Sequence, residues 1–166
     1  MNNKVVRLGI FLAFAMVLSY VEALIPIDFM IPGAKIGLAN LCIVLVLYLY
    51  GPIDALVINI IRVFLTAFMF TNLYSFLLSL CGALLSFIGM YIMKRTKKFE
   101  ILTVSAFGGI CHNIGQLLMA SVLYSSFYIM YYSVALIIIG LITGVLIGFL
   151  STEIIKRTKI YLETLE

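Results

Sequence analysis

The sequence predicts an all-α integral membrane protein, a single transmembrane domain over residues 1–166 with six spanning helices. Of its 166 residues, 64% are hydrophobic and 11% are charged, and the mean hydropathy is +1.23. Soluble proteins are about half apolar and a quarter charged. The apolar residues form several runs near the 20 or so that a spanning helix needs, without the alternation of barrel strands. The lipid bilayer is therefore the expected environment.

The first helix is expected over residues 8–24, ended by a proline. Lys4 and Arg7 precede it and predict a cytoplasmic N-terminus by the positive-inside rule. A convincing small-x-small cleavage site is lacking, so this helix is interpreted as an uncleaved span. Gly9 and Ala13 form a small-xxx-small pair, which lets another helix approach closely in lipid. The pair either packs within this protein or docks onto a partner subunit.

Two further helices are expected after an outer loop over residues 26–35, which carries Lys35. One covers residues 36–50 and has Asn40 near its start. The other covers residues 52–70, and the proline at its first position is compatible with a helix N-terminus.

Arg62 falls near the middle of the helix predicted over residues 52–70. Asn59, Arg62 and Thr66 are spaced by three and four residues, so they share one helix face. A charge at the bilayer midplane is costly and normally faces the bundle interior or a wet cavity. Arg62 is therefore a candidate ligand contact. The alternative is an arginine that joins helices through backbone carbonyls or Glu22.

The last three helices are expected over residues 72–93, 101–123 and 133–155. Basic clusters follow the first and the third of them, which predicts a plasma-membrane protein with both termini in the cytoplasm. Tyrosines between residues 124 and 132 form either an interfacial belt or a lid over a ligand. Glycines at a spacing of four residues in the last helix predict a close helix contact: Gly140, Gly144 and Gly148.

A polar face runs along the helix predicted over residues 101–123, within an arc of roughly 100°. Its members are Ser105, Gly109, His112, Asn113 and Gln116. Amide and imidazole groups among apolar neighbours are suited to fix a small ligand. The alternative is a hydrogen-bond network that only joins helices. Such bonds average below about 1 kcal/mol in membranes, so stability alone is a weak reason for the cluster.

Several kinds of chemistry are not indicated. The seven acidic residues are scattered, and no paired-aspartate motif, metal-ligand spacing or phosphate-binding loop occurs, so no enzyme activity, metal or cofactor is expected. The three cysteines are far apart in apolar surroundings and predict no disulfide framework. Because the basic residues flank apolar runs, they are topology signals rather than a nucleic-acid site.

Four motifs carry a family resemblance. They are residues 32–40 (PGAKIGLAN), Arg62-Val63, residues 79–86 (SLCGALLS) and residues 112–117 (HNIGQL). With these motifs the chain resembles the Gx transporter family, also labelled heptaprenyl diphosphate synthase component I, over nearly its whole length. Prenyl diphosphate synthases resemble one another by aspartate-rich Mg²⁺ motifs, which this sequence lacks. The resemblance therefore implies no synthase activity.

In size and helix layout this family is similar to the substrate-binding S components of energy-coupling factor (ECF) transporters. That similarity implies a subunit that takes up a vitamin-like micronutrient and docks onto a transmembrane coupling protein driven by two ATPases. The candidate ligand contacts are then His112, Asn113, Gln116, Arg62, Asn40 and Lys35, and the candidate docking residues are Gly9 and Ala13. Two cations and a histidine suggest an acidic group on the ligand.

Two other functions are open. One is a non-catalytic partner in isoprenoid or quinone metabolism, or a lipid-handling protein, for which a lateral or cytoplasmic opening of the pocket is expected. An outward opening favours uptake instead. The other is a purely structural membrane anchor, which predicts no cavity.

Overall fold

The computed structural model describes residues 3–24, 37–125 and 127–163. These residues form six α-helices and one 3₁₀-helix and contain no strand, which confirms the all-α prediction. In chain order the elements are α1 (Asn3–Leu24), α2 (Asn40–Leu49), α3 (Pro52–Phe70), α4 (Leu73–Arg95), α5 (Ile101–Leu123), η1 (Phe127–Tyr132) and α6 (Ser133–Glu163).

Five helices in the described part of the chain are long and apolar enough to cross a membrane. The remaining helix, α2, has 10 residues and rises roughly 15 Å, about half the thickness of the hydrocarbon core. It begins at Asn40 rather than at residue 36 because Gly37 has a φ of 86°, a left-handed conformation that cannot continue an α-helix. The last helix runs to Glu163, beyond its predicted end at residue 155.

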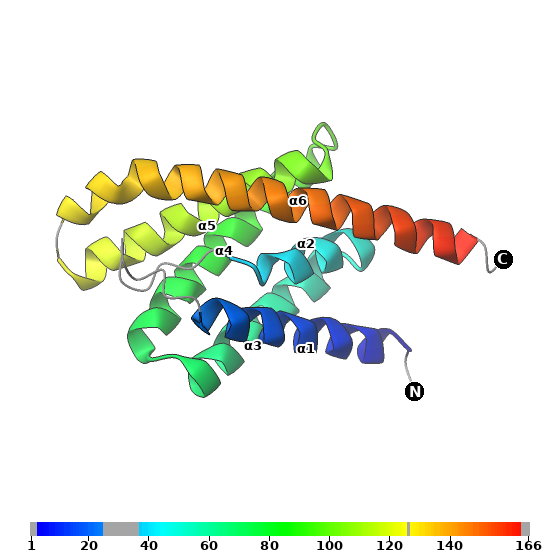
Figure 1. Ribbon diagram of the computed structural model, residues 1–166, viewed down its shortest axis with the longest axis horizontal. Helices are drawn as coiled ribbons and strands as arrows, with labels where there is room; N and C mark the ends of the chain where they lie inside the picture. The colour runs from blue at the N-terminus through cyan, green and yellow to red at the C-terminus, as the bar shows by residue number, and fades with distance from the viewer. Residues whose placement is uncertain (1–2, 25–36, 126, 164–166) are drawn as a thin grey trace.

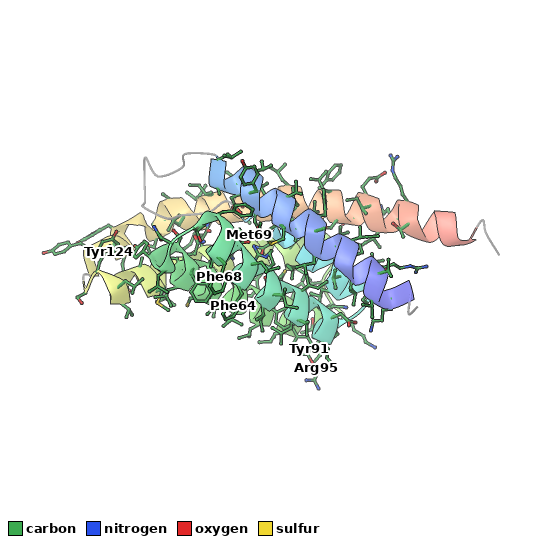
Figure 2. All side chains as sticks on the ribbon, turned by 90° about the horizontal axis from the view of Figure 1, so that it is seen from below. Phe64, Phe68, Met69, Tyr91, Arg95 and Tyr124 are labelled. Carbon is green, nitrogen blue, oxygen red and sulfur yellow. The ribbon has the colours of Figure 1, made fainter. Side chains whose placement is uncertain are left out.

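The helices form a bundle in which α5 packs between α4 and α6, while α2 is enclosed by α1, α3 and α6 (Figure 1). The first residues of α1 and the last residues of α6 lie at the same end of the bundle (Figure 1). Arg95 and Tyr124 lie toward opposite ends (Figure 2).

The short helix α2 forms the centre of the hydrophobic core. None of residues 42–47 is more than 3% exposed, because this helix is apolar on every face and has neighbours on all sides. Ile43 and Leu47 share one buried cluster with Met90 of α4 and Val104 of α5. The core therefore connects helices that are distant in sequence around a segment too short to span the bilayer alone.

Helix α5 is in backbone contact with both of its neighbours. A Cβ atom at Gly109 would overlap the carbonyl group of Gly140 on α6. On the opposite side, a Cβ atom at Gly115 would lie 2.8 Å from the carbonyl oxygen of Cys81 on α4. Glycine at these positions permits the close approach on which helix association in lipid depends.

The close contact predicted for the four-residue glycine repeat is confirmed. Besides Gly140, a Cβ atom at Gly144 would lie 2.8 Å from the Cα of Ala106, and one at Gly148 would lie 2.7 Å from the Cα of Leu102. The repeat therefore follows α5 along about two turns of α6.

Polar links join helix ends on the side of the bundle where α1 begins. Lys4 Nζ lies 2.9 Å from Asp54 Oδ2, which links the first turns of α1 and α3. Lys94 Nζ donates to the carbonyl oxygen of Leu47 at the end of α2 and lies 4.7 Å from the centre of the Tyr48 ring. Lysine is favourable at a helix C-terminus because the last carbonyls carry partial negative charge.

We predict that Gly109→Ala destabilises the bundle by about 1–3 kcal/mol, because the added methyl group forces α5 and α6 apart. The matched control is Gly9→Ala, where the methyl group has no neighbour within 4 Å and the gain in helix propensity makes the change neutral or slightly stabilising. Thermal melts in detergent, followed by a thiol-reactive dye that reports exposure of the three free cysteines, measure both variants. Equal melting temperatures for the two variants would contradict the backbone contact.

Candidate functional site

Arg62 is buried in the middle of the bundle, 6% exposed, and is surrounded by polar groups. Its Nη2 donates to Asn59 Oδ1 at 2.9 Å, one turn earlier on α3, and its Nη1 donates to Ser19 Oγ of α1 at 3.5 Å. Asn59 in turn donates through Nδ2 to the carbonyl oxygen of Ala83 on α4 at 3.1 Å. This set of side chains therefore ties together α1, α3 and α4.

Glu22 of α1 supplies the opposite charge. It is 5% exposed and interacts electrostatically with Arg62. Its Oε1 also accepts the backbone N–H of Gly37. Opposite charges that interact in a low-dielectric interior compensate each other in part, which makes their burial more tolerable. We refer to Ser19, Glu22, Asn59 and Arg62 as the Arg62 group.

A small cavity of about 10 Å³ lies against the Arg62 group, enough for one water molecule. Its polar lining residues are Ser19, Glu22, Arg62, Thr66, Thr71 and Ser79. Three buried polar atoms of this lining have no hydrogen-bond partner in the described part of the chain: Arg62 Nε, Thr71 Oγ1 and Ser79 Oγ. Buried polar atoms are normally satisfied, so the cavity has hydrogen-bonding capacity that the described residues do not use.

The only histidine of the sequence is buried on α5 and contacts Gln116. Its Nε2 lies 3.1 Å from Gln116 Nε2, one turn further along the helix. With the amide nitrogen as donor, Nε2 of His112 accepts, and the neutral ring carries its proton on Nδ1. The ring packs against Gly82 of α4, where a Cβ atom would lie 3.1 Å from His112 Cε1. We refer to His112 and Gln116 as the His112 pair.

The polar face of α5 divides between two neighbours. Asn113 donates through Nδ2 to the carbonyl oxygen of Leu136 on α6 at 2.7 Å, and Ser105 Oγ donates to the carbonyl oxygen of Gly144 at 2.8 Å. These two side chains join α5 to α6, which is the role that the helix-joining alternative describes. The His112 pair instead faces α4 and the turn before α2.

The turn before α2 connects the Arg62 group to the His112 pair through Gly37. The N–H of Gly37 is donated to Glu22, and a Cβ atom at Gly37 would lie 3.8 Å from His112 Cδ2 and 3.1 Å from Asn40 Nδ2. Asn40 is buried, and its backbone N–H donates to the carbonyl oxygen of Gly37 at 2.9 Å. The structure thus brings Arg62, His112, Gln116 and Asn40 to one region of the bundle. Lys35 lies outside the described residues.

The family model described as heptaprenyl diphosphate synthase component I matches residues 11–154. The chain belongs to this family. No curated protein and no solved structure matches it. The matched residues include the Arg62 group and the His112 pair, whereas Gly9 lies just before them.

The acidic side chains that the structure describes inside the bundle interact with cations or with a backbone N–H group. Within residues 3–24, 37–125 and 127–163, no three His, Cys, Asp or Glu side chains gather where a metal ion could bind. Glu22 interacts with Arg62 and Gly37, and Asp54 lies 2.9 Å from Lys4. The carboxylates inside the bundle thus neutralise cations.

Sequence reasoning placed Arg62 correctly in the interior but did not assign Ser19, Thr71 and Ser79 to a site, and it named Glu22 only as a structural partner. Glu22 could have been found, because a carboxylate inside an apolar span is costly and needs a partner. The serine and threonine residues carry no such signal, because single hydroxyl groups are common in membrane helices and acquire their roles from tertiary contacts.

The proposed docking pair lies on the exposed side of α1. A Cβ atom at Gly9 would have no neighbour within 4 Å, and both Gly9 and Ala13 are exposed. Of the two interpretations of this pair, packing within the described part of the chain is therefore excluded for Gly9. Large apolar side chains are exposed on the same helix, among them Ile10 and Val17.

We predict that Arg62→Met and Glu22→Gln each lower the stability of the bundle by about 3–5 kcal/mol, because each leaves one buried charge without its partner. The double variant should recover much of this loss, because both charges are then absent. Melting temperatures of the four proteins in the same detergent give the coupling free energy. Strictly additive losses would show that the two side chains do not compensate each other.

Proposed function

We propose that this chain is the membrane-embedded substrate-binding subunit of an ECF-type transporter, an S component that takes up a vitamin-like micronutrient. The observation that carries the proposal is the cavity beside Arg62, where buried Arg62 Nε and Ser79 Oγ have no partner in the described residues. A purely structural anchor has no use for such a cavity. The family match supports a membrane component, and the resemblance to S components supports uptake.

The contacts we propose for the ligand are those of the cavity, namely Arg62, Thr71 and Ser79. The His112 pair and Asn40 are close neighbours through Gly37 and form the second side of the proposed site. Asn113 is no longer a strong candidate, because its amide donates to the backbone of α6. Small hydrogen-bonding groups among apolar walls are typical of ligand sites in helix bundles.

The energy for uptake is proposed to come from a partner. The coupling protein and two ATPases of an ECF module would dock on the exposed face of α1 at Gly9 and Ala13, where the chain's own side chains leave the backbone accessible. Both termini are proposed to lie in the cytoplasm, because most of the basic residues belong to helix ends on that side.

A lipid-handling partner of isoprenoid or quinone metabolism is the second candidate. It is favoured by an apolar hollow of about 260 Å³ at the turn between α3 and α4, lined by Phe64, Phe68 and Leu73 among others. These walls are exposed on the outside of the bundle, where lipid is the solvent. Both candidates require a ligand, and they differ in whether a coupling module binds.

We predict that Ser79→Ala weakens retention of the bound small molecule about fivefold, because one hydrogen bond in the cavity is lost. Ser86→Ala is the matched control. Its hydroxyl group is also on α4, buried and without a partner in the described part of the chain, but it does not line the cavity. Native mass spectrometry of protein purified from membranes measures occupancy in all three proteins. Equal occupancy by the small molecule in both variants would show that the cavity is not its binding site.

We predict that Gly9→Leu abolishes co-purification of a coupling protein while leaving retention of the small molecule unchanged, because added bulk at an exposed helix contact prevents close approach. Thr103→Leu places the same side chain at an exposed position of α5 and should have no effect. The measurement is affinity capture from the native membrane, scored for an ATPase-bearing complex. Unchanged assembly in Gly9→Leu would reject this docking surface.

A further inference from the structure

The apolar hollow lies where α3 ends and α4 begins. It is lined by Phe64, Ala67, Phe68, Asn72, Leu73 and Phe76 and has a volume of about 260 Å³. Phe68 and Leu73 are 86% and 73% exposed, so the hollow opens onto the apolar outer surface of the bundle. Phe64 and Phe68 lie near one another along α3 (Figure 2). A molecule can therefore reach it sideways from the bilayer.

This hollow adjoins the polar cavity beside Arg62. Ala67 and Phe76 line both spaces, so the hollow and the cavity are neighbours at these two residues. The cavity side holds Arg62 and Ser79, which are 6% and 8% exposed and each have a buried polar atom without a partner in the described residues. An apolar space at the surface thus adjoins a buried polar one.

Their sizes limit the ligand. The polar cavity has room for about one water molecule and so accepts a group no larger than a hydroxyl or a carbonyl. The hollow is close to the lower end of the volumes of small-molecule sites and so accepts the bulk of the molecule. A ligand that fits both spaces has a small polar end and a larger apolar body.

The charged side chains beside the cavity also limit the polar end of the ligand. Glu22 lines the same cavity and carries the charge opposite to that of Arg62, so an anionic end of the ligand would lie beside a buried carboxylate. The atoms that lack partners are an N–H of Arg62 and the hydroxyl groups of Ser79 and Thr71. They can satisfy an uncharged oxygen that accepts hydrogen bonds.

We propose that the ligand is a neutral amphiphile that enters laterally from the bilayer, places its apolar body in the hollow and inserts a hydroxyl or carbonyl end beside Arg62 and Ser79. This inference rests on the proposed function of the cavity as a ligand site, and it names the class of ligand. Its lateral entry is the opening expected of the lipid-handling candidate rather than of uptake from outside. Among the described residues that line both spaces, Ala67 contributes only a methyl group, so we expect the Phe76 ring to move when the polar end enters.

Photoaffinity labelling of the purified protein in nanodiscs tests the proposal. Three probes with a diazirine in the same twelve-carbon chain are compared: an alcohol, an alkane and a sulfonate. We expect the alcohol to label residues 64–76 and to be displaced by unlabelled dodecanol. Dodecane should compete about fivefold less well because it lacks the hydrogen bond, and dodecanesulfonate at least about tenfold less well because it brings a charge.

Two variants locate the binding. Ala67→Leu adds bulk between the two spaces and should abolish the preference for the alcohol. Ser79→Ala should reduce that preference about fivefold, because one hydrogen bond is lost. Ser86→Ala should leave it unchanged. Melting temperatures show whether Ala67→Leu has lost its fold. If it has, Ser79→Ala, which only removes an oxygen atom, tests the proposal by itself.

Equal labelling by all three probes, unaffected by Ser79→Ala, would show that the hollow holds only bilayer lipid and would overturn the proposal. A preference for the sulfonate would overturn it as well. A purely polar molecule that co-purifies in a Ser79-dependent manner would refute the amphiphile but leave the substrate-binding function intact. Alcohol labelling that depends on Ser79, in a protein that binds no coupling module, would support the ligand class and refute ECF-type uptake.

Discussion

The contact of the α5 backbone with two neighbours at once is the constraint on which the rest of the bundle depends. In lipid there is no hydrophobic drive between helices, so association relies on close packing and on hydrogen bonds. Gly109 and Gly140 supply the contact with α6, and Gly115 supplies the contact with α4. These contacts on two sides fix the rotation of α5 about its own axis. It therefore decides that Asn113 meets the backbone of α6 while His112 meets α4 and the Gly37 turn.

Helix α1 is held differently from the others. Its surface is largely exposed, and its attachments to α3 include polar links at two levels, Lys4 to Asp54 at the start and Ser19 with Glu22 to Arg62 near the end. An exposed helix fixed by a few directional contacts keeps a long apolar face available to lipid or to a partner. The same Glu22 contacts the Gly37 turn, so the helix whose exposed face we propose for docking also lines the cavity beside Arg62.

The sequence predicted the helices well because hydropathy and charge clusters report directly on a membrane. It could not predict where α2 begins, because the left-handed conformation of Gly37 is stabilised by a contact with Glu22 that is distant in sequence. The sequence predicted the polar face of α5, but it did not predict that part of this face contacts α6 and part contacts α4. Residues within one arc of a helix can still face two neighbours when both approach closely. Arg62 was identifiable from the cost of its charge, whereas Ser79 and Thr71 became site residues only through the packing of α3 against α4.

The position of Glu22 also changes the chemistry expected of the ligand. Arg62, Lys35 and His112 taken from the sequence suggest an acidic group, because cations attract anions. Inside the bundle, however, Arg62 already has its counter-charge, and Lys35 lies outside the described residues. The carboxylate beside the cavity disfavours an anionic end, because a second buried negative charge would lose its hydration without gaining a new partner. The polar end of the ligand is then recognised by hydrogen bonds alone, and most of the affinity has to come from the apolar body that the hollow between α3 and α4 can cover.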